Sequence, residues 1–92
     1  MAITKIKHQG LKELFTKGRS KRIGTRYQAN AIEILDFLDF INGLDDCIGM
    51  RHFHPLIGKL KGHYAMSVSA NYRITFTFDS GNVTIEDFTD YH

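Results

Sequence analysis

The sequence YAMSVSANYRITFTFDSGNVTIEDFTDYH, residues 64–92, decides the fold of this chain. Polar and apolar residues alternate over 64–69 and again over 72–78, which predicts two β-strands. Residues 82–88 supply a third strand, and the intervening Asp79-Ser80-Gly81-Asn82 has the composition of a tight hairpin turn. We therefore predict a three-stranded antiparallel meander.

The two faces of this predicted meander differ in chemistry. On the strand 72–78, one face carries Tyr72, Ile74, Phe76 and Phe78. The opposite face carries Arg73, Thr75 and Thr77. An apolar face must be covered by other elements, whereas an arginine among small hydroxyl groups suits a solvent-exposed site. We predict that the first face forms the core and that the second stays open to a ligand.

The residues before the meander predict one strand and two helices. Ile3–His8 alternates and indicates a short strand. Gln9–Lys17 has leucines at helical spacing and ends at Gly18, a common helix stop. Tyr27–Asn42 has the strongest helical stripe, and Thr25 is the expected cap at its start.

This order of elements predicts a single α+β domain over residues 1–92. The order is β-α-α-β-β-β, which predicts a small sandwich with two N-terminal helices packed on one face of a mainly antiparallel, twisted sheet. Residues 45–63 contain three glycines and the chain's proline, so we expect an irregular segment of loop or short-strand character there.

Charge is segregated along the chain even though the net charge is only +2. Residues 1–26 hold eight basic residues and one acid, whereas residues 27–50 hold five acids and no base. Residues 51–78 carry four bases, and residues 79–92 carry four acids. The four blocks of +7, −5, +4 and −4 predict a bipolar surface whose basic part suits phosphates.

Other sequence features limit the compartment and the cofactors. Cys47 is the single cysteine, so no intrachain disulfide is expected, and a reducing compartment is compatible. Neither a signal peptide nor a membrane-spanning apolar run is visible, so we expect a cytoplasmic protein without a membrane partner. His52 and His54 lack further ligands at zinc-site spacing, so we predict no metal and no cofactor.

Several motifs in order along the chain resemble HigB-type toxins of the RelE/ParE superfamily. The first is Lys7-His8-Gln9-Gly10-Leu11, followed by Leu14-Phe15 and Gly18. The others are Phe53-His54-Pro55-Leu56, Lys61-Gly62-x-Tyr64, Ala70-Asn71-Tyr72-Arg73-Ile74-Thr75-Phe76 and the terminal Asp90-Tyr91-His92. Each motif is weak alone, but together they cover nearly the whole chain. The fold predicted above is also the RelE-like fold.

The resemblance implies a bacterial toxin that cuts mRNA in the A site of the small ribosomal subunit. It also implies a helix-turn-helix antitoxin of the HigA type as partner, with operator DNA bound only through that antitoxin. Carried over by motif, the active site would comprise His54, Asp90, Tyr91 and His92, and Arg73 would face the substrate. Ile57 occupies a position that is often basic in the family, and Lys59 or Lys61 could replace that charge.

The chemistry of these residues fits RNA cleavage without a metal. Attack of a ribose 2′-OH on the adjacent phosphate needs a base, an acid for the leaving 5′-oxygen and a cation for the phosphorane. His54 and His92 can serve as base or acid, and Asp90 can act as a second base or orient an imidazole. The sequence leaves their assignment open. Arg73 would hold the phosphate, and Tyr91 would stack or donate a hydrogen bond.

Other interpretations remain open at this stage. A terminal His92 is ordinarily a solvated end, and His54 an ordinary loop residue. His8, His52 and His63 are expected to be structural or loosely electrostatic. The basic residues of 1–26 could contact ribosomal RNA or the antitoxin, or could simply keep the surface soluble. The same fold would also serve a ParE-like, non-enzymatic inhibitor of DNA gyrase, or a catalytically inactive RNA-binding or repressor-associated module.

Overall fold

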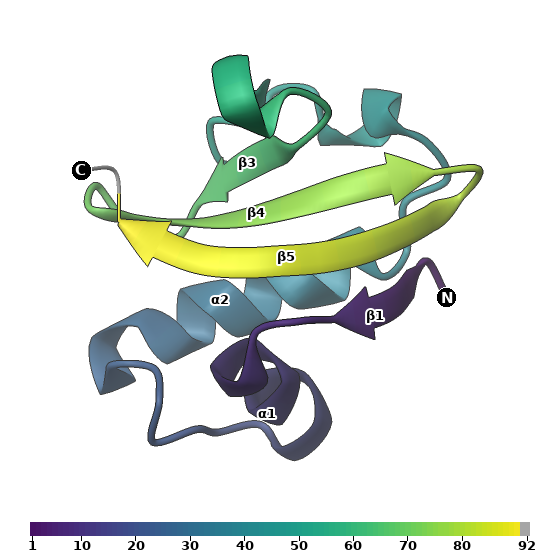
Figure 1. The fold of residues 1–92 in the computed structure, drawn as a ribbon. Coiled ribbons are helices and arrows are strands. Elements are labelled where there is room, and N and C mark those ends of the chain that lie inside the picture. The colour runs from purple at the N-terminus through teal and green to yellow at the C-terminus, as the bar shows by residue number, and fades with distance from the viewer. Residues whose placement is uncertain (91–92) are drawn as a thin grey trace.

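A single mixed sheet with helices on one face organises the chain, in a computed structural model that describes residues 1–90 (Figure 1). The sheet order is β1-β5-β4-β3-β2. Its strands are β1 (Ile3–Ile6), β2 (His54–Pro55), β3 (Tyr64–Ser67), β4 (Tyr72–Asp79) and β5 (Asn82–Asp90). The helices are α1 (Gln9–Lys17) and α2 (Thr25–Leu38), with short 3-10 helices η1 (Leu44–Cys47) and η2 (Gly58–Leu60). The predicted α+β class and order are confirmed, and the segment expected to have loop or short-strand character contains the two-residue strand β2.

The β4–β5 hairpin is the longest pairing of the sheet. Ser80 and Gly81 have φ angles of 51° and 87°, as a two-residue type I′ turn requires, and Asp79 pairs with Asn82 beside them. Thr75 pairs with Asp87 while Phe76 pairs with Ile85, so Glu86 is the extra residue of a β-bulge. β5 extends beyond the predicted end at residue 88 because Arg73 and Tyr72 still offer pairing partners.

β1 lies parallel to β5 at the sheet edge and is shorter than predicted. Ile6 pairs with Ile85, and the strand ends there instead of at His8. His8 caps α1 instead, because its Nδ1 accepts a hydrogen bond from the backbone N–H of Leu11 at 3.2 Å.

The helix boundaries confirm one prediction and correct another. α1 ends at Gly18 as predicted, with φ +80° and a hydrogen bond from its N–H to the Leu14 carbonyl. Gly24 precedes α2 without a side-chain cap, so the expected Thr25 cap was wrong. α2 ends at Leu38 and not at residue 42, because its C-cap residue, the buried Asp39, binds residues 2 and 3 instead of the next helical turn. Its carbonyl accepts from the Ala2 N–H at 2.7 Å and its carboxylate from the Ile3 N–H at 3.1 Å.

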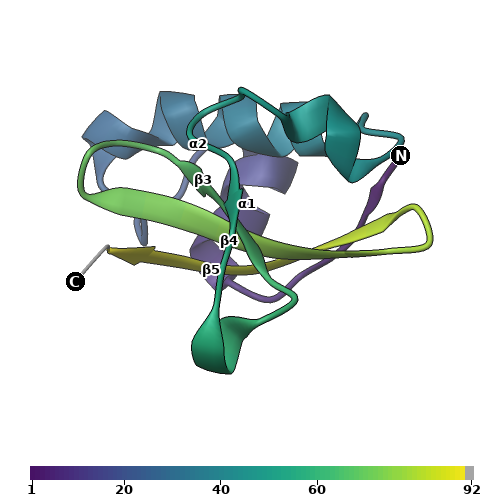
Figure 2. The same cartoon turned by 90° about the horizontal axis from the view of Figure 1, so that it is seen from above.

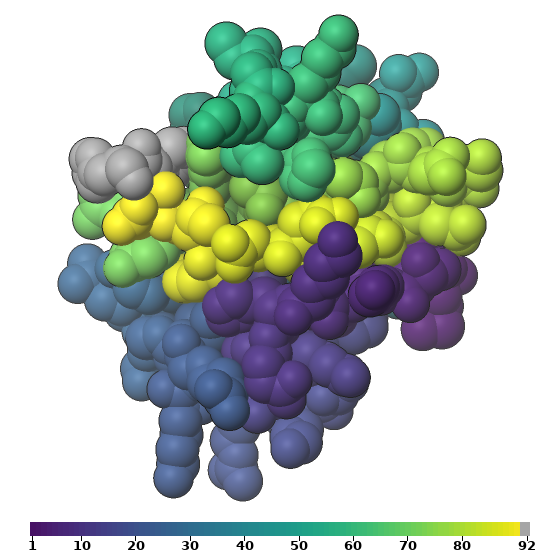
Figure 3. All heavy atoms as spheres, in the orientation of Figure 1, coloured from purple at the N-terminus to yellow at the C-terminus, as the bar shows by residue number. Residues whose placement is uncertain are grey.

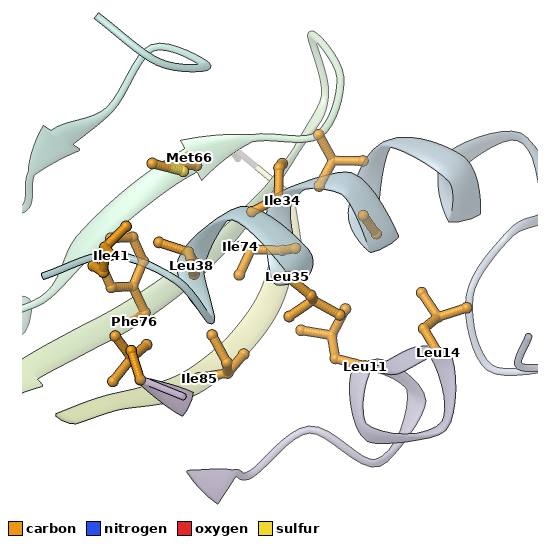
Figure 4. Close-up of a cluster of buried hydrophobic side chains, with 14 of the residues drawn as sticks. Leu11, Leu14, Ile34, Leu35, Leu38, Ile41, Met66, Ile74, Phe76 and Ile85 are labelled. Carbon is orange, nitrogen blue, oxygen red and sulfur yellow. The ribbon is translucent and has the colours of Figure 1, made fainter. Parts of the chain in front are cut away.

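The core lies between the helices and the apolar face of the sheet, as predicted (Figure 4). Ile74 and Phe76 are fully buried, whereas Tyr72 and Phe78 at the ends of the same face are half-buried. The helices and the flanking strands contribute Leu11, Leu14, Ile34, Leu35, Leu38, Met66 and Ile85. Each fully buried side chain of this size contributes about 1.5–3 kcal/mol of hydrophobic stabilisation.

The opposite face of the sheet is more covered than predicted. Thr75 is 4% exposed and Ala65 is 0% exposed. The segment 56–63, which contains η2, lies on this face, on the side away from the helices (Figure 2). A hydrogen bond from the Leu56 N–H to the His63 carbonyl, 2.9 Å long, closes the segment at its base. In the space-filling view it stands out beyond β4 and β5 (Figure 3). The prediction that this face is open is therefore wrong in part. Segment 56–63, which we call the covering segment, lies over it, and hollows remain beside that segment.

Candidate active site

His54 enters the sheet from a strained turn that is attached to β3. The two residues before Phe53, Arg51 and His52, have left-handed φ angles of 49° and 55°. Such angles are costly for residues other than glycine and persist only where the surroundings impose them. Here the Arg51 carbonyl accepts a hydrogen bond from the Ser67 N–H at 2.8 Å, and the Arg51 side chain forms a 2.8 Å ion pair with Glu33 on α2. The turn therefore fixes where β2 begins.

The same turn determines how the His54 imidazole presents its nitrogens. Nδ1 lies 2.7 Å from the backbone carbonyl oxygen of His52. A carbonyl oxygen only accepts hydrogen bonds, so this contact requires a proton on Nδ1. The neutral imidazole then carries its lone pair on Nε2. His54 is half-buried beside a hollow of about 760 Å³.

Strand register brings His54 and Arg73 to one face of the sheet. His54 pairs with Ala65, and Ala65 pairs with Thr75. In the next row of the same face, Ser67 pairs with Arg73 and Arg73 pairs with Thr89. Paired residues project to the same side, and the spacing of strands and residues sets the two Cα atoms roughly 12 Å apart.

A second hollow contains Arg73 and lies between the sheet and the segment 56–63. It has a volume of about 470 Å³ and is lined by Leu60, His63, Arg73, Thr75, Glu86, Asp87, Thr89 and Asp90. The half-buried Arg73 donates from Nε to the Thr89 hydroxyl at 3.4 Å. Ser67 borders the His54 hollow and is the strand partner of Arg73, so the two hollows adjoin. Thr89 was missed from the sequence, although its place opposite Arg73 in the hairpin could have indicated it.

Glu86 lines the Arg73 hollow and connects it to Lys7, which follows the edge strand β1. Its Oε1 lies 2.9 Å from Lys7 Nζ and 3.9 Å from His63 Nε2, and its Oε2 accepts from the Thr77 hydroxyl at 3.0 Å. Burial acts to raise the pKa of Glu86. The hydrogen bonds from Lys7 and Thr77 and the positive charges of Lys7 and His63 outweigh it, so the pKa lies below its ordinary value. His63, expected to be structural or loosely electrostatic, is part of this network.

The remaining predicted site residues lie at the chain end and on the covering segment. Asp90 is exposed and borders the Arg73 hollow. Asp90 pairs with Tyr72, so its register is that of the helix-side face, and it borders the hollow at the end of β5. Tyr91 and His92 lie outside the described residues. Lys59 and Lys61 are exposed on the covering segment, as is Ile57 at 88%.

No group of three or more His, Cys, Asp or Glu side chains that could hold a metal occurs within residues 1–90. No helix in that range is long and apolar enough to cross a membrane. Burial, with the nearby charge of Asp46, raises the pKa of the Cys47 thiol to about 11. This thiol is therefore protonated at neutral pH and a poor nucleophile.

A basic hollow lies apart from these residues, where α1 leads into α2. It has a volume of about 1140 Å³ and is lined in part by the exposed cations Lys17, Arg19, Lys21 and Arg22. The loop is held from within, because Gln28 Nε2 donates to the carbonyls of Ser20 and Ile23 at 2.7 and 2.8 Å. These cations therefore extend from a fixed backbone.

Comparison with known proteins assigns the chain to a family. A family model described as RelE-like toxin of type II toxin-antitoxin system HigB matches residues 4–92. Endoribonuclease HigB of Proteus vulgaris is 33% identical over 91 residues, covering 98% of this chain and 99% of that protein. This chain belongs to the HigB-like toxin family.

Solved structures share the fold of this HigB-like toxin. The YoeB–YefM complex of Staphylococcus aureus contains a chain with a TM-score of 0.67 and 19% identity, covering 100% of this chain and 97% of that chain. A YoeB/ParE toxin of Agrobacterium tumefaciens has a TM-score of 0.65 and 13% identity, with 100% of both chains covered. At such identities these structures confirm the RelE-like α+β fold and carry no information about the activity of this chain.

The Glu86 network predicts a specific loss of stability in acid. A carboxylate whose folded pKa lies below its ordinary value of 4.5 stabilises the fold above that pH, and this stability is lost as pH falls through the folded pKa. We expect the free energy of unfolding, measured with urea, to fall more between neutral pH and about pH 3 for the wild type than for Glu86→Gln. Thr77→Val, which removes one of the hydrogen bonds, should give an intermediate loss. Parallel losses in the wild type and Glu86→Gln would contradict this account.

Proposed function

We propose that this HigB-like toxin is a ribosome-dependent mRNA endonuclease that cuts in the A site. Cleavage proceeds without a metal, by attack of a ribose 2′-OH on the adjacent phosphate. Endoribonuclease activity is supported by family membership and by the name of the Proteus vulgaris relative. The observation that carries the mechanism is that His54, with Nδ1 bound to a carbonyl, shares a sheet face with Arg73.

His54 is suited to accept the proton of the attacking hydroxyl. With Nδ1 donating to the His52 carbonyl, Nε2 is the basic nitrogen of the neutral ring. The carbonyl also stabilises the imidazolium formed once the proton has moved, because it then faces an N–H of a charged ring. A positioned acid or base of this kind contributes about 10²–10⁴-fold to the rate.

Arg73 is suited to bind the phosphate on which negative charge develops. The Thr89 hydroxyl accepts from its Nε, and strand pairing on both sides fixes its backbone. A planar guanidinium held in this way stabilises the phosphorane more than the ground state if its donors match the equatorial oxygens. Lys59 and Lys61, on the covering segment, add positive charge above the same face.

Asp90, Tyr91 and His92 complete the site by their family motif. His92 donates the proton to the leaving 5′-oxygen, Asp90 orients an imidazole from the strand end, and Tyr91 stacks on a base. Tyr91 and His92 lie outside the described residues, so their roles rest on the family motif alone.

The partners follow from the same assignment. A type II toxin requires an antitoxin, and we propose a helix-turn-helix protein of the HigA type that also carries the pair to operator DNA. One structural neighbour, a chain of the YoeB–YefM complex, is likewise found with a second protein. The chain acts in the cytoplasm, where translating ribosomes present the mRNA. The basic hollow with Lys17 and Arg19 contacts ribosomal RNA, a dense array of phosphates.

Cleavage by variants tests the chemistry. In a translating extract, His54→Gln and His92→Gln should each slow mRNA cleavage by about 10²-fold or more, and Arg73→Lys should also slow it. The wild-type products should end in a 2′,3′-cyclic phosphate and a 5′-hydroxyl. His8→Asn is the matched control, because asparagine preserves the cap of α1 while removing an imidazole.

Three outcomes would reject this proposal. Full activity of His54→Gln removes that imidazole from the mechanism. Equal cleavage of naked mRNA without ribosomes rejects ribosome dependence. Accumulation of gyrase–DNA breaks without mRNA cleavage identifies the gyrase-inhibitor alternative.

Binding to purified ribosomes tests the basic hollow. The double charge reversal Lys17→Glu with Arg19→Glu should weaken binding and reduce the dependence of affinity on salt by about one slope unit for each phosphate that is no longer neutralised. Lys5→Glu with Lys12→Glu is the matched control, because both lysines are exposed and lie outside the hollow. An unchanged salt slope in the first double variant would place the ribosome on another surface.

A further inference from the structure

An apolar surface with an acidic rim lies at the end of α2, away from the candidate active site. Phe37, Phe40 and Ile41 line a hollow of about 820 Å³ together with Asp36 and Asp46. We call these five residues the α2-end patch. Phe40 is 77% exposed, an unusual state for a phenylalanine in an ordered segment.

The backbone holds Phe40 in this exposed position. Its N–H donates to the Phe37 carbonyl at 3.1 Å, and the preceding Asp39 is buried against β1. The following Ile41 is only 5% exposed. With both neighbours buried, the chain cannot turn Phe40 inward without breaking the contacts of Asp39 and Ile41.

More apolar surface follows in the next segment. Ile48 is 70% exposed and Met50 is 40% exposed, just after the η1 turn that carries Asp46. Asp46 in turn accepts from the Asn42 N–H at 2.7 Å, which ties η1 to the end of α2. Within the hollow itself, the exposed Phe40 beside Phe37 and Ile41 forms an apolar surface of the kind that is typical of an interaction site.

Charge limits what can bind to the patch. Residues 27–50 contain five acids and no Lys, Arg or His, and Asp36, Asp45 and Asp46 are exposed. Anionic lipid and RNA are repelled by such a rim. A second copy of this chain offers cations around its basic hollow, but the one large apolar residue there, Ile23, is buried at 2% exposure. An apolar hollow with exposed carboxylates at its rim is complementary to a protein segment with both apolar and basic side chains.

The patch lies at the opposite end of the sheet from Asp90. Phe40 and Gly81 border a common hollow beside the β4–β5 turn. From that turn, β5 runs nine residues to Asp90 at the other end, a distance of roughly 27 Å. Substitutions in the patch can therefore be separated from substitutions on the face with His54 and Arg73.

We propose that the α2-end patch binds the cognate antitoxin, through an antitoxin segment that carries apolar side chains flanked by Lys or Arg. The proposal rests on the proposed function, which supplies the antitoxin. In this complex Phe40 is the central apolar anchor. Asp36 and Asp46 at the rim select the basic partner and accelerate its association.

Calorimetry with purified chains tests the proposal. The probe is the purified antitoxin encoded beside this toxin's gene, titrated into the full-length toxin. Phe40→Ser and Asp36→Lys should each raise the Kd, the first by about 10-fold or more. The matched controls Ile57→Ser and Asp87→Lys change an exposed apolar residue and an exposed acid on the other face, and should leave the Kd within about 2-fold. Higher salt should weaken wild-type binding.

The outcomes separate this proposal from its rivals and from the proposed function. Weaker binding by Ile57→Ser or Asp87→Lys, with Phe40→Ser unaffected, overturns the proposal and locates the antitoxin on the active-site face. No binding by the wild type, or a change only in toxin self-association by light scattering, also overturns it. Cleavage of mRNA by each variant is measured in parallel. Retained cleavage by Phe40→Ser shows that the fold is intact, whereas absent wild-type cleavage rejects the nuclease and leaves the binding result standing.

Discussion

The pairing of β3 with both β2 and β4 is the constraint on which the candidate site depends. β3 supplies Ala65 between His54 and Thr75, and Ser67 beside Arg73. It also supplies the N–H of Ser67 that holds the Arg51 carbonyl of the strained turn. If β4 were shifted by one residue along β3, Arg73 would point into the core and Ile74 would point into the hollow. The buried Ile74 and Phe76 oppose that shift, so the same packing that stabilises the fold aligns the site.

Most of the fold was predictable because its determinants are local. Strand alternation, the Ser80–Gly81 turn and the Gly18 helix stop each depend on a few neighbouring residues, and each is found as predicted. The errors concern long-range contacts. α2 ends early because Asp39 binds residues 2 and 3, and Thr75 is buried beneath a segment that no periodicity describes. Neither interaction leaves a signal in the residues next to it.

The candidate site was predictable in its residue types and only partly in its arrangement. The motifs around His54 and Arg73 indicate chemistry, but β2 has two residues, too few for alternation to indicate which face His54 takes. The His52 carbonyl that selects the protonated nitrogen depends on two left-handed residues, Arg51 and His52, neither of which is a glycine. Sequence rules assign such angles to glycine or asparagine, so this turn could be found only from coordinates.

Several local conformations in this molecule are energetically unfavourable, and each lies at or beside a residue with a proposed function. The Arg51–His52 turn costs on the order of 1–3 kcal/mol per residue in backbone strain, and it precedes the proposed base. The Glu86 bulge interrupts the longest strand pair beside Arg73. Phe40 remains in solvent although the core lies next to it. In each case neighbouring contacts hold the costly conformation in place.

The central claim is that the fold fixes the protonated nitrogen of His54, and NMR of the ¹⁵N-labelled protein tests it directly. In long-range ¹H–¹⁵N spectra recorded where the ring is neutral, the account predicts that Nδ1 carries the proton and Nε2 has the shift of an unprotonated nitrogen. This tautomer is the less common one in free imidazole side chains, so its observation would identify the hydrogen bond to His52. A neutral ring protonated on Nε2, or one that averages between the two forms, would contradict the account.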